Sequence, residues 1–205
     1  MRISLEHISK KFQRHWILKE LTLQLETPDS IALLGPNGSG KSTLLRIIAA
    51  IQPPSKGKVI YEREGRSIEP MKVFPFISFA APGMEIIEEL TLTEFFSFHF
   101  QFKRPLGNRS IPDLIREIGL EEAASRPIAD YSSGMKQRVK LAQAIFADTP
   151  VLLLDEPCTN LDQKGVDQYR RWIADHTSGR MVVVASNDPR EYDFCKRVMD
   201  VTAYK

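Results

Sequence analysis

The sequence predicts an α/β fold built on a mostly parallel sheet, and two observations support this. Short apolar runs bounded by glycine and proline alternate with segments of helical period, which is the pattern of strands joined by crossover helices. Hydrophobic residues make up 42% and charged residues 26% of the 205-residue chain. That composition is typical of one compact domain with room for a small insertion.

The first part of the chain predicts antiparallel strands, followed by a buried strand and a helix. Apolar and polar residues alternate along residues 1–25, which predicts antiparallel strands around an exposed turn. Ile31 to Leu34 predicts a buried strand that ends at Gly35. From Ser42 onward, apolar residues recur on one helical face until the proline pair at 53–54 stops the pattern. We therefore expect a strand, a glycine loop and a helix in succession.

The rest of the chain predicts more strands and a helical insertion. No strand pattern appears between about residues 82 and 130, where Thr93 and Glu94 predict the start of one helix and Ser110 to Glu117 part of another. We expect a single domain, 1–205, in which a helical subdomain, 81–130, is inserted in a core of 1–80 and 131–205. The polar stretch Arg63 to Pro70 is expected to be a loop. Further strands are expected at Gly57 to Tyr61, Val73 to Ala80, Val151 to Asp155 and Met181 to Ser186.

Charge and cysteine content exclude several classes of protein. The 28 Lys and Arg against 26 Asp and Glu leave a formal charge of +2, too balanced for a nucleic-acid surface. Cys158 and Cys195 supply neither a disulfide framework nor metal-ligand spacing. Met1 to Ile8 lacks the apolar block of a signal peptide, and the longest apolar runs fall far short of the roughly 20 residues that cross a bilayer. We expect a cytoplasmic protein with no membrane span of its own.

A glycine-rich loop lies between the first predicted parallel strand and the helix after it. Residues 35–43 read Gly-Pro-Asn-Gly-Ser-Gly-Lys-Ser-Thr and fit the G-x-x-x-x-G-K-[ST] pattern. The glycines let successive N–H groups face inward, and the helix adds its positive end, so the loop can hold the β- and γ-phosphates of a nucleotide. The alternative, a glycine turn with a chance lysine, is disfavoured by the correct flanks on both sides. The candidate phosphate-binding residues are Gly35, Pro36, Asn37, Gly38, Ser39, Gly40, Lys41, Ser42 and Thr43.

Two acidic residues end a later buried strand. Asp155 and Glu156 follow an apolar run, so they are expected at the carboxyl edge of the parallel sheet, where such sheets bind ligands. With the hydroxyl of Ser42, Asp155 is a candidate ligand of Mg²⁺, which prefers oxygen ligands. Glu156 is the candidate that polarises an attacking water. A strand that merely ends in two solvated acids is the alternative, and Lys41 in a phosphate loop disfavours it.

Ahead of this strand, residues 131–138 read Tyr-Ser-Ser-Gly-Met-Lys-Gln-Arg and precede a segment of helical period. They match at Ser132 and Gly134 the signature of the ABC ATPase family, roughly Leu-Ser-Gly-Gly-Gln. The chain resembles this family from Phe12 to Asp188, with its motifs in the family's order. The resemblance implies that Ser132 and Gly134 meet the γ-phosphate held by another subunit, so that ATP joins a dimer. A simple helix N-cap at Ser132 is the alternative.

The resemblance assigns two further candidate residues. Asp162, at the end of the stretch from Cys158, matches the acid of the family's D-loop. Phe12 occupies the place of an aromatic ring that stacks on adenine, for which any π-surface suffices. A core position for Phe12 remains an alternative.

The sequence departs from the family pattern at two positions. The glutamine expected after the strand ending near Ala80 is replaced by Ala81 or Pro82, neither of which has a side-chain oxygen. The switch histidine is replaced by Asn187, whose amide can donate a hydrogen bond but cannot carry a proton near neutral pH. We expect Asn187 to join Lys41 and Glu156 as a catalytic candidate, nucleotide binding to persist, and turnover to be slow or dependent on a partner.

The resemblance also implies a fold and a function for the whole chain. The fold is that of a P-loop NTPase, with a mostly parallel core sheet, an N-terminal antiparallel β subdomain and an inserted helical subdomain. The function is an ATP-binding and hydrolysing subunit that energises an ABC transporter, as a homodimer or heterodimer around two MgATP. The length resembles single-domain exporter ATPases and leaves no room for a C-terminal regulatory domain.

The implied partners are separately encoded transmembrane permease subunits, which would hold the chain peripherally on the inner face of the cell membrane. Two alternatives remain open from the sequence. One is an ABC ATPase that serves assembly or repair rather than transport. The other is a nucleotide-gated module with little turnover, which the residues Ala81 and Asn187 favour.

Overall fold

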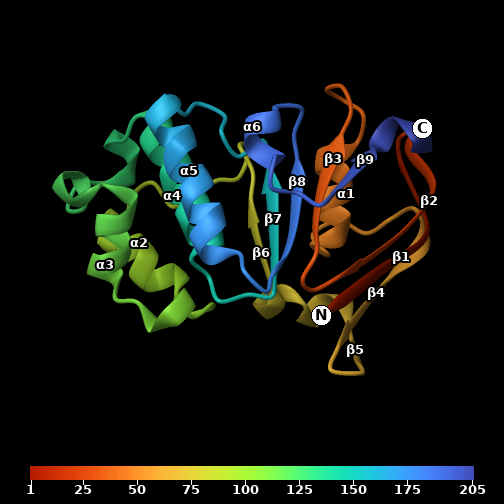
Figure 1. The fold of residues 1–205 in the computed structure, drawn as a ribbon, viewed down its shortest axis with the longest axis horizontal. Helices are drawn as coiled ribbons and strands as arrows, with labels where there is room; N and C mark the ends of the chain where they lie inside the picture. The colour runs from red at the N-terminus through yellow and green to blue at the C-terminus, as the bar shows by residue number, and fades with distance from the viewer.

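The computed structural model describes residues 1–205 and arranges them around two β-sheets (Figure 1). One sheet is four-stranded with the order β2-β1-β4-β5, and its paired strands are antiparallel. The other is five-stranded with the order β6-β7-β8-β3-β9, and its pairs are parallel. This confirms the predicted parallel core and N-terminal antiparallel sheet. The bounds are β1 Arg2–Phe12, β2 His15–Glu26, β3 Ser30–Leu34, β4 Lys56–Arg63, β5 Arg66–Ile68, β6 Ile77–Ala80, β7 Val151–Asp155, β8 Met181–Ala185 and β9 Arg197–Asp200.

The helices divide into one beside the antiparallel sheet and a group on the other side of the parallel sheet (Figure 1). Helices α2 and α3 pack against each other and against α4, so the region around residues 92–118 forms a helical layer next to α4. Helix α2 begins at Leu92, one residue before the expected Thr93, because Thr91 forms a capping box with Glu94, and Ser110 caps α3 rather than lying within it. The bounds are α1 Lys41–Ile48, α2 Leu92–His99, α3 Ile111–Ile118, α4 Ser133–Ile145, α5 Gln163–His176 and α6 Pro189–Tyr192.

Two hydrophobic cores lie on the two faces of the parallel sheet. Residues of α1, of the antiparallel sheet and of one sheet face form the first, which includes Leu44, Ile3 and Val183. Residues of α2 to α5 and of the opposite face form the second, which includes Phe96 and Val184. All five residues of β7 and of β8 are buried, as expected for parallel strands covered on both faces. Their carboxyl ends therefore meet at one edge of a rigid sheet.

Four elements differ from the expectations. The strand expected from Val73 begins only at Ile77, because Phe74–Phe76 is a 3₁₀ turn built on a proline. Arg63 to Pro70 is not a simple loop but contains β5, which pairs with β4 through a turn whose two central residues, 64 and 65, have φ of 53° and 74°. Helix α1 ends at Ile48, before the proline pair, and β9 had no apolar run to predict it.

A titratable group lies in the packing between α2 and α4. The Nε2 atom of His99 is 3.1 Å from the backbone oxygen of Gln143. Burial, and then the positive charge of Lys103, lower the pKa of His99 from its usual 6.5 to about 4. The Lys103 ammonium is itself buried and donates to the backbone oxygen of Ile77 at 2.6 Å.

Acidification is therefore expected to destabilise the fold through His99. The unfolded chain takes up a proton near pH 6.5, whereas the folded chain resists it down to about pH 4, so the free energy of unfolding falls across that window. The loss at pH 5 is on the order of 1–2 kcal/mol. Urea unfolding at pH 7 and pH 5 should show a smaller pH effect in His99→Gln than in the unaltered protein. Equal pH effects in the two proteins would contradict the assignment.

Candidate functional site

The carboxyl edge of the parallel sheet brings the predicted site segments together. The loop of residues 35–40 follows β3, Glu156 follows β7, and Asn187 lies after β8. The register places Asp155 beside Ala185, at the adjoining ends of β7 and β8. A cavity of about 260 Å³ lies over this edge, lined by Phe12, Ile17, Asn37, Gly38, Ser39, Gly40, Lys41, Ser42, Thr43 and Glu156.

The loop presents unpaired hydrogen-bond donors to this cavity. The first in-helix bond of α1 runs from the Leu44 N–H to the oxygen of Gly40 at 2.8 Å, so the N–H groups of Lys41, Ser42 and Thr43 remain free for a ligand. Gly40 has φ 105°, and a Cβ there would lie 2.9 Å from the Ile17 side chain, so only glycine suits the position. The Ser39 hydroxyl is buried without a partner. These unsatisfied donors suit an anion such as a phosphate chain.

Lys41 is the positive charge of the loop. Its ammonium is buried and donates to the backbone oxygen of Gly35 at 2.5 Å and to that of Pro36 at 3.5 Å. Both acceptors are neutral carbonyls rather than carboxylates, so the positive charge is not neutralised by them. An anionic ligand in the loop would supply the missing counter-charge, and these residues therefore fit a bound nucleotide.

Ser42 and Asp155 form the oxygen-rich part of the site. The Ser42 hydroxyl donates to Oδ1 of Asp155 at 3.0 Å, and Asp155 is only 5% exposed. Burial raises the pKa of Asp155, and the charge of Glu156 adds to this, while the Ser42 hydrogen bond and nearby Arg46 and Lys41 act against it. A hydroxyl and a carboxylate at this spacing offer the ligand type that Mg²⁺ prefers, so the residues present fit that ion.

Glu156 is held at the cavity by an unusual backbone conformation. Its φ is 42°, a left-handed value rarely adopted by residues other than glycine, and its N–H donates to the oxygen of Ala185 at 2.9 Å. The residue lines the cavity described above and also an adjoining hollow of about 310 Å³, which Asn37 and Asn187 share. Glu156 therefore stands between the phosphate loop and the segment after β8.

Asn187 is engaged with the backbone of the phosphate loop. Its Nδ2 donates to the oxygen of Gly35 at 2.8 Å, and its Oδ1 accepts the Gly35 N–H at 3.1 Å. The Gly35 oxygen also accepts from Lys41, so one carbonyl joins the switch position to the lysine. In this arrangement both ends of the Asn187 amide are occupied, and the residue acts on the cavity through the loop.

The residues expected to meet a second subunit lie outside the cavity. Ser132 caps α4, because its hydroxyl accepts the Met135 N–H at 3.3 Å, and Asp162 caps α5 through the Gly165 N–H at 2.8 Å. A Cβ on Gly134 would lie 3.1 Å from the oxygen of Asn160, so the start of α4 lies against the segment after β7. Ser132, Gly134 and Asp162 thus gather around neighbouring helix starts, and none of them lines the cavity with Lys41.

Phe12 and the position of the absent glutamine complete the set of predicted residues. The Phe12 ring is 46% exposed, lines the cavity and has the Lys10 ammonium 5.4 Å from its centroid, so a core position is excluded. Ala81 is buried, and Pro82 contributes only its backbone oxygen, which accepts from Lys140 at 2.6 Å. No side-chain oxygen therefore reaches the site from the end of β6.

One residue that the sequence did not indicate joins the segments after β7 and β8. Glu191 is buried, and its Oε1 accepts the Cys158 N–H at 2.7 Å. Burial raises its pKa, against hydrogen bonds from Ser186 and Cys158 that favour the charged form. The Tyr169 hydroxyl donates to its backbone oxygen at 2.7 Å. A single acid in a short polar stretch carries no periodic or motif signal, so sequence reasoning had no means of finding it.

A parallel sheet whose carboxyl edge holds a glycine loop, a buried lysine and paired acids defines a P-loop nucleotide-binding fold. A family model described as ABC transporter matches residues 18–159. The chain belongs to that family, as the motifs indicated.

Relatives of known sequence agree with this assignment. The probable sulfate/thiosulfate import ATP-binding protein CysA of Chlorella vulgaris is 34% identical over 84% of this chain and 74% of its own length. The corresponding protein of Cucumis sativus is 34% identical over 84% of this chain and 51% of its own length. An uncharacterized ABC transporter ATP-binding protein of Bacillus subtilis is 30% identical over 96% of this chain and 65% of its own length. The chain spans about half the length of several relatives it matches.

Solved structures share the fold. A putative ABC transporter ATP-binding protein from Pyrococcus furiosus has a TM-score of 0.82 at 20% identity and covers 100% of both chains. A dimeric ATP-binding cassette in a post-hydrolysis state, bound to ADP and Pi, has a TM-score of 0.82 at 24% identity over 98% of this chain and 95% of its own. No helix of the present chain has both the length and the apolar character needed to cross a membrane.

Replacing Asn187 is expected to weaken nucleotide binding through the loop. Asn187→Ala removes two hydrogen bonds to Gly35, each worth about 1 kcal/mol, so affinity for ATP and for ADP should fall together by about tenfold. Asn187→Asp keeps the acceptor for the Gly35 N–H but loses the donor and adds a negative charge. Calorimetric titration with both nucleotides measures the effect. A loss confined to ATP would show that Asn187 contacts the γ-phosphate instead.

Proposed function

We propose that this chain binds and hydrolyses MgATP and thereby energises an ABC transporter. One observation supports this most directly: Lys41, Ser42 and Glu156 line one cavity, and Asp155 bonds to Ser42 behind it. Positive charge, free N–H groups and oxygen ligands meet there in the arrangement that phosphoryl transfer requires. The family of the chain and the names of its relatives agree with the proposal.

Each residue has a distinct part in the proposed reaction. The N–H groups at the start of α1 and the Lys41 ammonium hold the β- and γ-phosphates and offset negative charge as it develops. Ser42 and Asp155 are the residues that would hold Mg²⁺, and the bound ion would supply positive charge to offset that of the phosphates. Glu156 orients the attacking water and accepts its proton. Phe12, exposed at the end of β1, stacks on the adenine.

The proposed assembly contains two such chains, or one chain and a relative. Ser132 and Gly134 lie at the N-terminus of α4, whose positive end suits an anion, but they do not line this chain's own cavity. A second subunit facing the first would bring them to the γ-phosphate bound by Lys41. Asp162 at the start of α5 would then border the same interface.

Transport also requires partners outside this chain. We propose that residues 81–130 act as the inserted helical subdomain that passes the closure of the dimer to separate permease subunits, and that these hold the chain at the inner face of the membrane. The transported solute of the relatives, sulfate or thiosulfate, is not assigned to this chain, because specificity belongs to the permease. A role in assembly or repair is less favoured, since the named relatives are transport proteins.

The dimer can be tested while the helix cap at Ser132 is kept intact. Glu156→Gln should lower ATP turnover by about a hundredfold or more, retain MgATP and shift the protein to a dimer in gel filtration. Adding Ser132→Asp preserves the cap, because aspartate caps helices as well as serine does, but places a negative charge against the partner's γ-phosphate. The double variant should keep its melting temperature and remain monomeric. A dimer formed equally well by the double variant would refute the shared site.

ATP turnover is expected to be slow because the glutamine and the switch histidine of the family pattern are both absent. Ala81 and Pro82 offer no side-chain oxygen to the water, and Asn187 cannot carry a charge. Pro82→Gln or Ala81→Gln, each combined with Asn187→His, should raise the steady-state rate at least about tenfold. Glu156→Gln in the same backgrounds is the matched control that should abolish the gain. Rapid hydrolysis by the unaltered chain alone would contradict the explanation.

A further inference from the structure

Glu191 is a buried acid that has no part in the reaction as proposed above. It lies in the short helix α6 and is only 5% exposed. It borders the hollow of about 310 Å³ that Glu156 and Asn187 also line, but not the cavity around Lys41. A carboxylate is buried at a cost unless hydrogen bonds compensate for the lost water, so the partners of Glu191 indicate what it does.

One of these partners is a backbone peptide group just after the acidic strand. Oε1 of Glu191 accepts the N–H of Cys158 at 2.7 Å. The carbonyl of the same peptide group belongs to Pro157, and it accepts the side-chain amide of Gln137 at 2.7 Å. Gln137 lies near the start of α4 and is only 3% exposed. Two buried side chains from different helices thus hold both polar ends of the peptide between Pro157 and Cys158.

This peptide group lies next to the residue that carries the proposed water-orienting carboxylate. Glu156 has a φ of 42°, and a residue in this left-handed region keeps its conformation only where surrounding contacts over-determine it. Its own N–H donates to the oxygen of Ala185 at 2.9 Å, which fixes the chain before it. The ring of Pro157 restricts the backbone after it, and the held peptide follows directly. The backbone is therefore constrained on both sides of Glu156.

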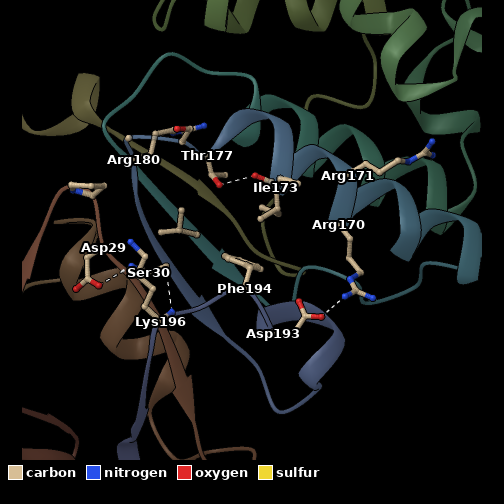
Figure 2. A pocket seen from close by; sticks show the side chains of 15 residues that line it. Asp29, Ser30, Arg170, Arg171, Ile173, Thr177, Arg180, Asp193, Phe194 and Lys196 are labelled. Carbon is tan, nitrogen blue, oxygen red and sulfur yellow. Dashed lines mark hydrogen bonds and ion pairs between the residues drawn. The ribbon is translucent and has the colours of Figure 1, made fainter.

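Helix α6 is itself anchored to α5, so Glu191 acts from a fixed support. The Tyr169 hydroxyl of α5 donates to the backbone oxygen of Glu191 at 2.7 Å, and Tyr169 is fully buried. The next residue of α5, Arg170, pairs with Asp193 directly after α6, as Figure 2 shows at the edge of a separate hollow beside α5. These two contacts hold both the backbone and the end of α6 in place.

We propose that Gln137 and Glu191 are positioning residues of the ATPase reaction, which orient Glu156 by holding the peptide between Pro157 and Cys158. This inference rests on the proposed function, because it concerns the water that Glu156 orients. The two side chains, here called the peptide clamp, act through the backbone and not on the nucleotide. A carboxylate suits position 191 because its partner is a donor, and hydrogen bonds to a charged acceptor are stronger than neutral ones.

The peptide clamp predicts a loss of rate without a loss of nucleotide affinity. Gln137→Leu and Glu191→Leu each leave one end of the peptide group unpaired, so Glu156 is displaced and kcat at saturating MgATP should fall at least about tenfold. Affinity for ATP in calorimetric titration should stay within about twofold, since neither side chain lines the cavity around Lys41. Glu191→Gln keeps an oxygen for the Cys158 N–H and should retain most of the rate.

Two further measurements separate the peptide clamp from a general loss of stability. Both variants free the same peptide group, so Gln137→Leu combined with Glu191→Leu should lower kcat by much less than the product of the single effects. Hydrogen exchange in the segment 156–162 should become faster in each single variant, which reports on the clamp without ATP hydrolysis. If Glu191→Leu does not fold, Gln137→Leu decides the question, because it removes no charge.

Gln143→Leu is the matched control, because Gln143 is a second buried glutamine of α4. It is 7% exposed, and its amide lies 4.0 Å from the sulfur of Met84, away from the segment after β7. Its kcat should equal that of the unaltered chain.

The proposal is overturned if Gln137→Leu keeps its kcat, if its affinity for ATP falls as much as its kcat, or if Gln143→Leu lowers kcat equally. In each of these cases Glu156→Gln would still lower turnover, and the proposed function would stand. If the unaltered chain shows no hydrolysis that Glu156→Gln lowers, the proposed function itself fails, and the positioning role fails with it.

Discussion

The ammonium of Lys41, buried against two neutral carbonyls, is the constraint on which the nucleotide site depends. Its hydrogen-bond acceptors are neutral and Asp155 is the carboxylate near it, so an anion bound in the loop would add a counter-charge to a buried cation. The same Gly35 carbonyl that holds Lys41 also accepts from Asn187. The shape of the loop, the position of the lysine and the end of β8 are therefore linked through a single peptide group.

A second set of contacts holds the elements after β7 in place. The Gln137 amide donates to the oxygen of Pro157 at 2.7 Å, and Glu191 accepts the N–H of Cys158 from the other side. The start of α4, the segment after the acidic strand and the short helix after β8 thus form one hydrogen-bonded unit. In the proposed dimer this unit would connect the water-positioning Glu156 of one site with the residues that face the other site.

The parts of the structure that could be predicted from sequence are those with a local physical cause. The strand, loop and helix around Gly35 followed from an apolar run, glycines and a helical period, and the carboxylates of β7 followed from a strand that ends in acids. The pairing of Asn187 with Gly35 could not be predicted, because the two are 152 positions apart and meet only through the register of β3 and β8. The polar hairpin of β5 was missed because its turn carries no asparagine–glycine pair, and Glu191 because burial alone makes it significant.

The close approach of Ile17 to Gly40 brings the antiparallel sheet against the phosphate loop. Ile17 lies near the start of β2, and Phe12 ends β1, so the two flank one hairpin turn. In the proposed complex the purine ring lies on Phe12 at one side of that hairpin, and Ile17 at the other side lies close to the backbone of the phosphate loop. The same hairpin would therefore contact both the base and the loop that holds the phosphates.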